Sequence, residues 1–169
     1  MRRRRLRMSL YAGVLFTVLG LLAWVTGQPF IFPSLGPSAF ILAFEGRSAQ
    51  TAPRRVIGSH FIGSLAGLVA YLLVANGVIL TDSFAPFSPA GLRLAASGVL
   101  SIALTSFAMF ETDTVHAPAC ATTLIVSLGL LSTPVKAATI VVSVVILVVS
   151  HRIALGSVDW VGVRFPSQS

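Results

Sequence analysis

Six apolar stretches separated by short polar breaks run along the chain. They cover residues 8–26, 30–45, 56–80, 92–110, 117–131 and 135–152. A helix that crosses a bilayer needs about 20 apolar residues, so the first, third, fourth and sixth stretches are long enough to span and the second and fifth are not. The pattern predicts an all-α membrane protein, a helical bundle of four full spans and two broken half-helix segments.

The two short stretches share a design. Pro33, Gly36 and Pro37 precede the apolar run of the second stretch, and His116 and Pro118 precede that of the fifth. Proline is tolerated in the first turn of a helix and breaks a helix interior, which predicts helix starts near residues 34–37 and 117–118 after an extended segment. Each half-helix would be only about 13–20 Å long at about 1.5 Å per residue, so it would begin partway into the membrane.

A weak internal repeat relates the two halves of the chain. A shift of 81 residues places Pro37 on Pro118 and Pro53 on Pro134. We therefore expect a single transmembrane domain built from two similar halves. Its predicted parts are a basic tail at 1–7, a first repeat at 8–80, a linker at 81–91, a second repeat at 92–152 and a C-terminal tail at 153–169.

Composition supports a membrane location and excludes a soluble domain. The chain is 55% hydrophobic and 10% charged, with a mean hydropathy of +0.90, whereas soluble domains carry about 25% charged residues. The net charge is +7, and five of the twelve basic residues are the arginines within 2–7. That cluster is typical of a cytoplasmic topology signal, so we expect a lipid bilayer rather than a nucleic acid as partner.

The positions of the basic residues leave two topologies open. If all six stretches cross, Arg47, Arg54 and Arg55 lie on the same side as the N-terminal arginines. If the short stretches are re-entrant and only four helices cross, those three residues move to the far side. Positive charge gathers on the cytoplasmic side, which favours six crossings, a cytoplasmic N-terminus and two halves of opposite orientation.

The breaks are the candidate functional site. Irregular backbone at membrane depth must be buried in protein or line a polar cavity, so we expect the two breaks to face each other. Helix N-termini carry partial positive charge and exposed amide donors, which suit a small anion. The candidate anion-binding residues are Ser34, Gly36, Pro37, Ser38, His116, Ala117, Pro118, Thr122 and Thr123.

His116 is the foremost candidate because an imidazole beside a helix start can donate to an anion or carry a proton. Glu111 and Asp113 are candidates for proton transfer or gating, although an ordinary solvated helix end explains them better. His60 is a further candidate on the same grounds, and its closeness to Arg55 also suits a structural role. The chain shows no metal cluster, cofactor motif or catalytic constellation, so we expect no cofactor and no enzyme activity.

Two sets of small residues predict close helix packing. Ser59, Gly63 and Gly67 recur every fourth residue, and Ser97, Ser101 and Thr105 do the same. Small residues at this spacing let helices approach closely in a membrane, so both sets are interpreted as packing faces.

Three segments of the chain resemble the HPP family of integral membrane proteins, named for a His-Pro-Pro motif. They are "PSLGPSAFILAF", "APRRVIGSHFIG" and "TVHAPACATTL". The chain departs from the family pattern at Ala117, where the first proline would stand, at Cys120, where a glycine would stand, and at Ser59. Because plastid and cyanobacterial members are associated with nitrite transport, the resemblance implies a small monovalent anion such as nitrite as substrate.

Three functions are weighed. The first is a transporter or channel for a small anion, with the half-helix starts as its binding site. The second is a non-transporting scaffold or accessory subunit in which the breaks serve packing. A membrane-embedded enzyme using His116 and Asp113 is the weakest of the three. Six segments make a small bundle for a solitary transporter, so we also expect a homo-oligomer.

Overall fold

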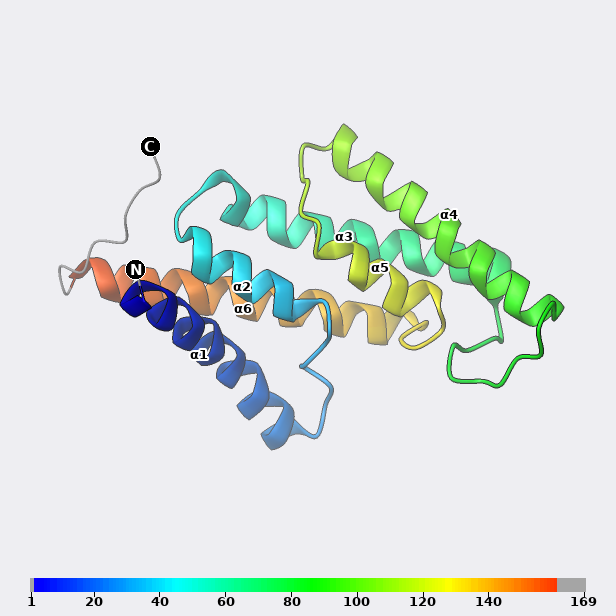
Figure 1. Cartoon of the computed structure of the whole chain (residues 1–169), viewed down its shortest axis with the longest axis horizontal. Coiled ribbons are helices and arrows are strands. Elements are labelled where there is room, and N and C mark those ends of the chain that lie inside the picture. Colours follow the sequence, from blue (N-terminus) through cyan, green and yellow to red (C-terminus); the bar gives the residue numbers. More distant parts are fainter. Residues whose placement is uncertain (1, 161–169) are drawn as a thin grey trace.

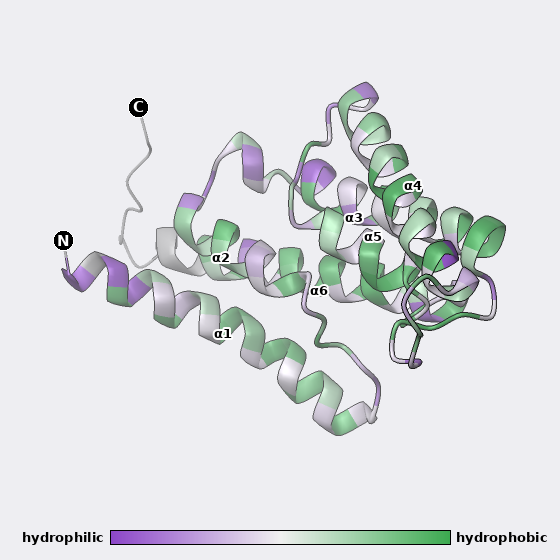
Figure 2. Cartoon of the chain, turned by 45° about the vertical axis from the view of Figure 1, so that its right-hand side comes forward, coloured by the Kyte–Doolittle hydropathy of each residue, from purple (hydrophilic) through white to green (hydrophobic). Residues whose placement is uncertain are grey.

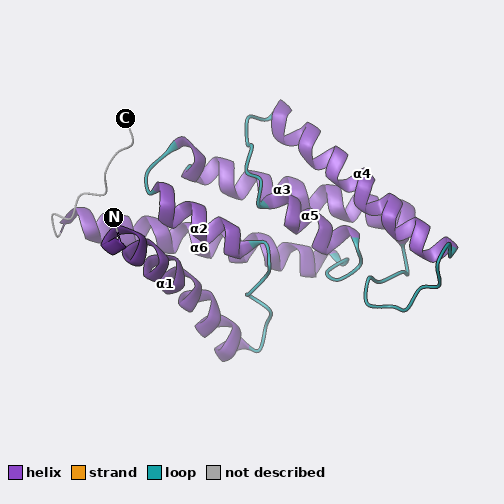
Figure 3. Ribbon diagram, viewed as in Figure 1, coloured by secondary structure: helices purple, strands orange, loops and turns teal. Residues whose placement is uncertain are grey.

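The described part of the chain, residues 2–160 of a computed structural model, is helical and contains no strand (Figures 1 and 3). The prediction of an all-α protein is confirmed. The part of the predicted C-terminal tail beyond residue 160 lies outside the described residues. The helices are α1 (Arg2–Thr26), α2 (Leu35–Glu45), α3 (Pro53–Ala70), α4 (Pro89–Glu111), α5 (Ala119–Ser127) and α6 (Pro134–Trp160), with a π-helical turn, η2 (Tyr71–Ala75), continuing α3 and a 3₁₀ turn, η1 (Ala49–Thr51), before it.

Four helices are long and apolar enough to cross a membrane, as predicted: α1, α3 with η2, α4 and α6. Large hydrophobic side chains lie exposed along them, among them Trp24, Phe61, Phe107 and Ile153. Figure 2 shows hydrophobic colouring along the length of these helices and hydrophilic colouring at the start of α1. Exposed apolar flanks of this extent suit contact with lipid, and the chain is a multi-pass membrane protein.

The helix starts follow from proline and capping chemistry. Pro53, Pro89 and Pro134 each begin a helix, where a missing amide hydrogen has no cost. Ser88 caps α4, because its hydroxyl accepts a hydrogen bond from the amide of Gly91. The basic segment is helical from Arg2 and forms the first turns of α1, since arginine is a good helix former and an apolar helix follows directly.

The long helices α3 and α6 pack against each other in the middle of the bundle, with α1 and α4 on the outside (Figure 1). Helix α1 contacts α2 and α6, and α4 contacts α5 and α3. The helix contacts of the two halves therefore correspond. The α1–α2 contact matches the α4–α5 contact, and the α1–α6 contact matches the α4–α3 contact. This arrangement agrees with the inverted repeat, which stays a prediction.

Hydrogen bonds identify the two ends of the bundle. At one end, the Tyr11 hydroxyl near the start of α1 lies 2.9 Å from Nδ1 of His151 late in α6, and Nε2 of His151 lies 3.2 Å from the carbonyl oxygen of Gly46, just after α2. Arg55, near the start of α3, pairs with Asp113 at the end of α4. We call this the basic end, since Arg47 and Arg152 also lie there.

The opposite end joins the other termini of the same helices. The Arg93 side chain, at the start of α4, donates to the carbonyl oxygens of Val74 and Asn76 after α3. The Leu80 amide donates to the carbonyl oxygen of Leu128, just after α5, at 2.9 Å. Helix α2 therefore ends at the basic end and α5 ends at the opposite end, as Figure 1 shows. The arginines at 47, 54 and 55 share the end where α1 begins, which is the arrangement that six crossings require.

Candidate functional site

Five buried polar side chains meet where the two short helices begin. They are Ser34, Ser38, His60, His116 and Thr122, each at most 2% exposed, and we call them the central cluster. Ser34 and Ser38 belong to the start of α2, His116 precedes α5, Thr122 lies in α5, and His60 comes from α3. The cluster therefore draws on both broken segments and on the long helix that packs against α5.

A chain of hydrogen bonds connects four of these residues. The Ser38 hydroxyl lies 3.0 Å from Nε2 of His116 and 3.0 Å from Nε2 of His60. On the other side of the His60 ring, Nδ1 lies 2.7 Å from the Thr122 hydroxyl. The imidazole rings of His60 and His116 have centroids 5.6 Å apart. Ser38 thus joins the two histidines, and through them the start of α2 to α3 and to the segment before α5.

The Ser38 hydroxyl has a single hydrogen, so it donates to at most one of the two Nε2 atoms. The other imidazole must donate its own Nε2 hydrogen to the Ser38 oxygen if both bonds are made. Rotating the hydroxyl and exchanging histidine tautomers reverses the direction of the chain. This reversal moves only hydrogens and leaves the heavy atoms in place.

One polar group of the cluster has no hydrogen-bond partner among the described residues. It is the Ser34 hydroxyl, which is fully buried. An unpartnered hydroxyl in a dry interior costs about 1–3 kcal/mol, so such groups mark places where a ligand or water is accommodated.

The backbone amides contribute less than the sequence predicts. The first three amides of α5, at residues 119–121, donate to the carbonyl oxygens of residues 116–118 at 3.0–3.1 Å. At the start of α2, the Leu35 amide donates to the Phe32 carbonyl oxygen, and Pro37 has no amide hydrogen. The expectation of exposed amide donors is therefore wrong for these groups, because tight turns satisfy them. The partial positive charge of each helix start remains.

The remaining predicted residues lie around the cluster rather than within it. Thr123 faces α4, where its hydroxyl lies 2.8 Å from that of Thr105 and donates to the Ala119 carbonyl oxygen. Ala117 and Pro118 form the turn that begins α5, and Gly36 and Pro37 occupy the first turn of α2.

The two acidic candidates lie at the basic end, outside the cluster. Asp113 is 81% exposed and pairs with Arg55 at 3.0 Å, and Glu111 is exposed at the end of α4. Neither carboxylate makes a hydrogen bond with His116 among those the structure describes. Their roles in proton transfer or gating stay predictions, but the geometry places the second histidine, not a carboxylate, next to His116.

His60 is the residue that sequence reasoning underestimated. Its distance from Arg55 suggested a position near the interface, whereas the structure buries it completely and bonds both of its ring nitrogens. The available signal was an ionisable residue inside an apolar span, which is a functional candidate in any membrane protein.

The packing faces lie where the small residues predict. A Cβ atom added to Gly63 would lie 2.7 Å from the Thr123 hydroxyl and 2.8 Å from the Ala119 carbonyl oxygen, and one added to Gly67 would meet the Thr123 carbonyl oxygen at 2.7 Å. On α4, Ser97 donates to the Ser127 carbonyl oxygen at 2.8 Å. Both faces hold α5 tightly and so fix the position of Thr122 in the cluster.

Comparison with known proteins gives one family match. The family model described as "HPP, transmembrane region" matches residues 2–157, nearly the whole chain. No curated protein and no solved structure matches the chain. The match covers all six helices and the central cluster.

Proposed function

The chain belongs to the HPP family of transmembrane proteins, and from that premise we propose that it carries a small inorganic anion across the membrane. The observation that supports this proposal most strongly is the contact between Ser38 and His116. It joins the starts of two half-helices that run to opposite ends of the bundle. Broken helices that meet inside a bundle are how many secondary transporters build their binding sites.

The chemistry of the central cluster suits a small monovalent anion. Ser34, His116 and the dipoles of α2 and α5 offer hydrogen-bond donors and partial positive charge. None of the five cluster residues is a lysine or arginine, so the site supplies no fixed full charge to balance a multivalent ion. Nitrite, the substrate implied by the family resemblance, fits these limits, and we propose it as the leading candidate.

The geometry also suggests how access alternates. Helix α2 leads from the cluster to the basic end and α5 leads to the opposite end. All five cluster residues are buried, which agrees with a closed state of the proposed cycle. Breaking the contact between Ser38 and His116 would separate the two halves at their junction and open the cluster toward one end.

The test is anion uptake into liposomes that contain the purified protein. We expect nitrite uptake above that of empty liposomes, with nitrate, formate and chloride measured alongside. Ser34→Ala should lower the initial rate at least fivefold. Ser127→Ala is the matched control, because it removes another buried hydroxyl without a partner at the far end of α5, and its rate should stay within twofold of the unaltered protein.

Uptake equal to that of empty liposomes for all four anions would overturn the proposal. If Ser34→Ala and Ser127→Ala lowered the initial uptake rate equally, the central cluster would not be the anion-binding site.

A second candidate function is a membrane scaffold or accessory subunit. The observation that favours it is the internal satisfaction of His60, whose two ring nitrogens both bond to side chains of the protein. In this case the central cluster is a hydrogen-bond network that stabilises the packing of the helices. The scaffold function predicts no anion flux into liposomes, and a partner protein that copurifies in a stoichiometric amount.

A further inference from the structure

A second polar site lies at the basic end, separate from the central cluster. It is a pocket of about 310 Å³ between the end of α2, the connection at residues 46–52 and the last part of α6. Its lining residues are Gly46, Arg47, Ser48, Thr51, Ala52, His151, Arg152 and Leu155. We propose that this pocket, which we call the basic pocket, binds a phosphate group, in the form of the headgroup of an anionic phospholipid.

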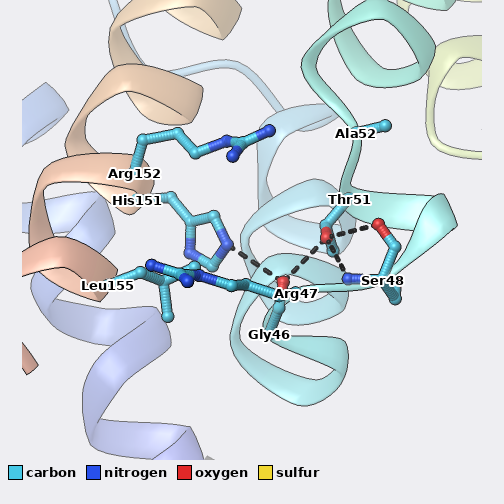
Figure 4. Close-up of a pocket in the computed structure, with 8 residues that line it drawn as sticks. All are labelled: Gly46, Arg47, Ser48, Thr51, Ala52, His151, Arg152 and Leu155. Carbon is cyan, nitrogen blue, oxygen red and sulfur yellow. Dashed lines mark hydrogen bonds between the residues drawn. The ribbon is translucent and has the colours of Figure 1, made fainter. Parts of the chain in front are cut away.

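Two arginines from different parts of the chain line the pocket. Figure 4 shows the Arg152 side chain reaching from α6 toward the 46–52 connection, while Arg47 reaches the other way, from that connection toward Leu155. Figure 4 shows the His151 ring between the two arginine side chains. Guanidinium groups are well matched to phosphate oxygens, because their planar N–H donors bond two oxygens at once.

The frame of the pocket is rigid. His151 is 1% exposed and is held by Tyr11 and by the carbonyl oxygen of Gly46. Thr51 donates to the same carbonyl oxygen at 2.7 Å. The Ser48 hydroxyl is engaged by Glu45, to which it donates at 2.7 Å. These bonds fix the connection against α6, and the Glu45 carboxylate accepts a hydrogen bond from Ser48.

The surface below the pocket favours a lipid over a soluble ligand. Exposed apolar residues follow one face of α6, with Val142, Val145, Val149 and Ile153 spaced three or four residues apart. Arg152 lies at the end of that face nearest the basic end, one residue before Ile153 and three after Val149. A phospholipid whose phosphate binds Arg152 could lay an acyl chain along this stripe.

The electrostatic setting agrees with an anionic lipid. Exposed arginines at positions 2, 3, 5 and 7 begin α1 at the same end of the molecule. Basic residues at a cytoplasmic surface attract anionic lipids by about 1 kcal/mol each. The N-terminal arginines would raise the local concentration of such lipids, whereas the basic pocket would bind one of them at a defined place.

The test measures lipid binding to the full chain in detergent micelles. Dioleoyl phosphatidylglycerol, which carries a net negative charge, is compared with dioleoyl phosphatidylcholine and with inorganic phosphate. Readouts are the thermal unfolding midpoint and the number of bound lipids by native mass spectrometry. We expect phosphatidylglycerol to raise the midpoint and to remain bound, and phosphatidylcholine to do neither.

Two double variants distinguish lipid binding in the basic pocket from general attraction of the lipid to positive charge. Arg47→Gln combined with Arg152→Gln should weaken phosphatidylglycerol binding at least tenfold. The matched control, Arg2→Gln combined with Arg3→Gln, removes the same charge from the same end outside the pocket and should change binding less than threefold.

Equal weakening in the two double variants, or no preference for phosphatidylglycerol over phosphatidylcholine, would overturn the proposal. An equal rise in midpoint with inorganic phosphate alone, lost in the pocket variant, would support the phosphate site and assign it to a soluble ligand. Because no flux is measured, failure here is independent of the proposed transport function.

Discussion

At the scale of single residues, Ser38 connects the two halves of the candidate site. One hydroxyl bonds two buried imidazoles that come from α3 and from the segment before α5. Ser34, four residues earlier, supplies a backbone oxygen 3.3 Å from the Ser38 hydroxyl and has an unpartnered hydroxyl of its own. The small size of both serines lets the histidines approach the start of α2.

Replacing Ser38 with alanine should therefore destabilise the fold. The variant leaves Nε2 of both histidines without its partner in a dry interior, so we expect a loss of about 1–3 kcal/mol in the free energy of unfolding. The measurement is equilibrium unfolding in mixed micelles. Ser9→Ala, which removes an exposed hydroxyl of α1, is the control and should change stability by less than about 0.5 kcal/mol. An equal change in both variants would contradict the described hydrogen-bond chain.

Sequence reasoning identified Ser38, His116 and Thr122 as candidates because they lie beside the proline breaks. It placed His60 less well. Counting from Arg55 gives the depth of His60 along α3, but not the face of the helix to which its side chain points. That face depends on how α3 packs against α5, which a single sequence does not specify. The pairing of His151 with Tyr11, 140 positions apart, was missed for the same reason.

At the scale of helices, the contact between α3 and α5 holds the site together. Gly63 and Gly67 allow the backbone of α5 to approach so closely that a Cβ atom at either position would lie within 2.8 Å of a neighbouring atom. This close approach sets the depth at which Thr122 meets His60.

A single methyl group should disturb this contact. Gly63→Ala forces α3 and α5 apart and should destabilise the protein by about 1–3 kcal/mol, the usual effect of overpacking. Gly13→Ala is the matched control, since an added Cβ atom on α1 has no neighbour within 4 Å. Alanine is the better helix former, so the control should be neutral or more stable by up to about 1 kcal/mol. Equal stability of the two variants, measured by thermal unfolding, would contradict the packing.

The helix boundaries were largely predictable and the environment of the helix ends was not. Proline marks the starts of α3, α4 and α6, and the starts of α2 and α5 fall within two residues of the expected positions. The turns that satisfy the amides at residues 119–121 depend on local backbone angles rather than on residue type. The basic segment is helical from Arg2, because charge marks a membrane boundary but does not end a helix.

At the scale of the whole molecule, the arrangement of helix ends predicts the topology. Residues 47 and 113 lie at the basic end, and residue 84 lies in the connection between α3 and α4 at the opposite end (Figure 1). Single cysteines at these three positions, in a Cys120→Ser background, should be labelled by a membrane-impermeant maleimide from one side for 47 and 113 and from the other side for 84. Labelling of residue 47 from the side opposite the N-terminus would contradict six crossings.

The inverted repeat is an inference at this scale as well. The two prolines 81 residues apart begin α3 and α6, and helix contacts map onto each other when the halves are exchanged. An arrangement of this kind gives two half-helices of opposite direction, which is what brings Ser38 to His116.

The most direct test of the account is the rate of nitrite uptake by liposomes containing the His116→Ala protein, normalised to folded protein and compared with His151→Ala. Both variants remove a buried histidine, one from the central cluster and one from the basic end. The account predicts that His116→Ala lowers uptake to the level of empty liposomes, while His151→Ala retains at least half of the rate. Full uptake by folded His116→Ala protein would contradict the claim that the junction of the two half-helices is the anion site.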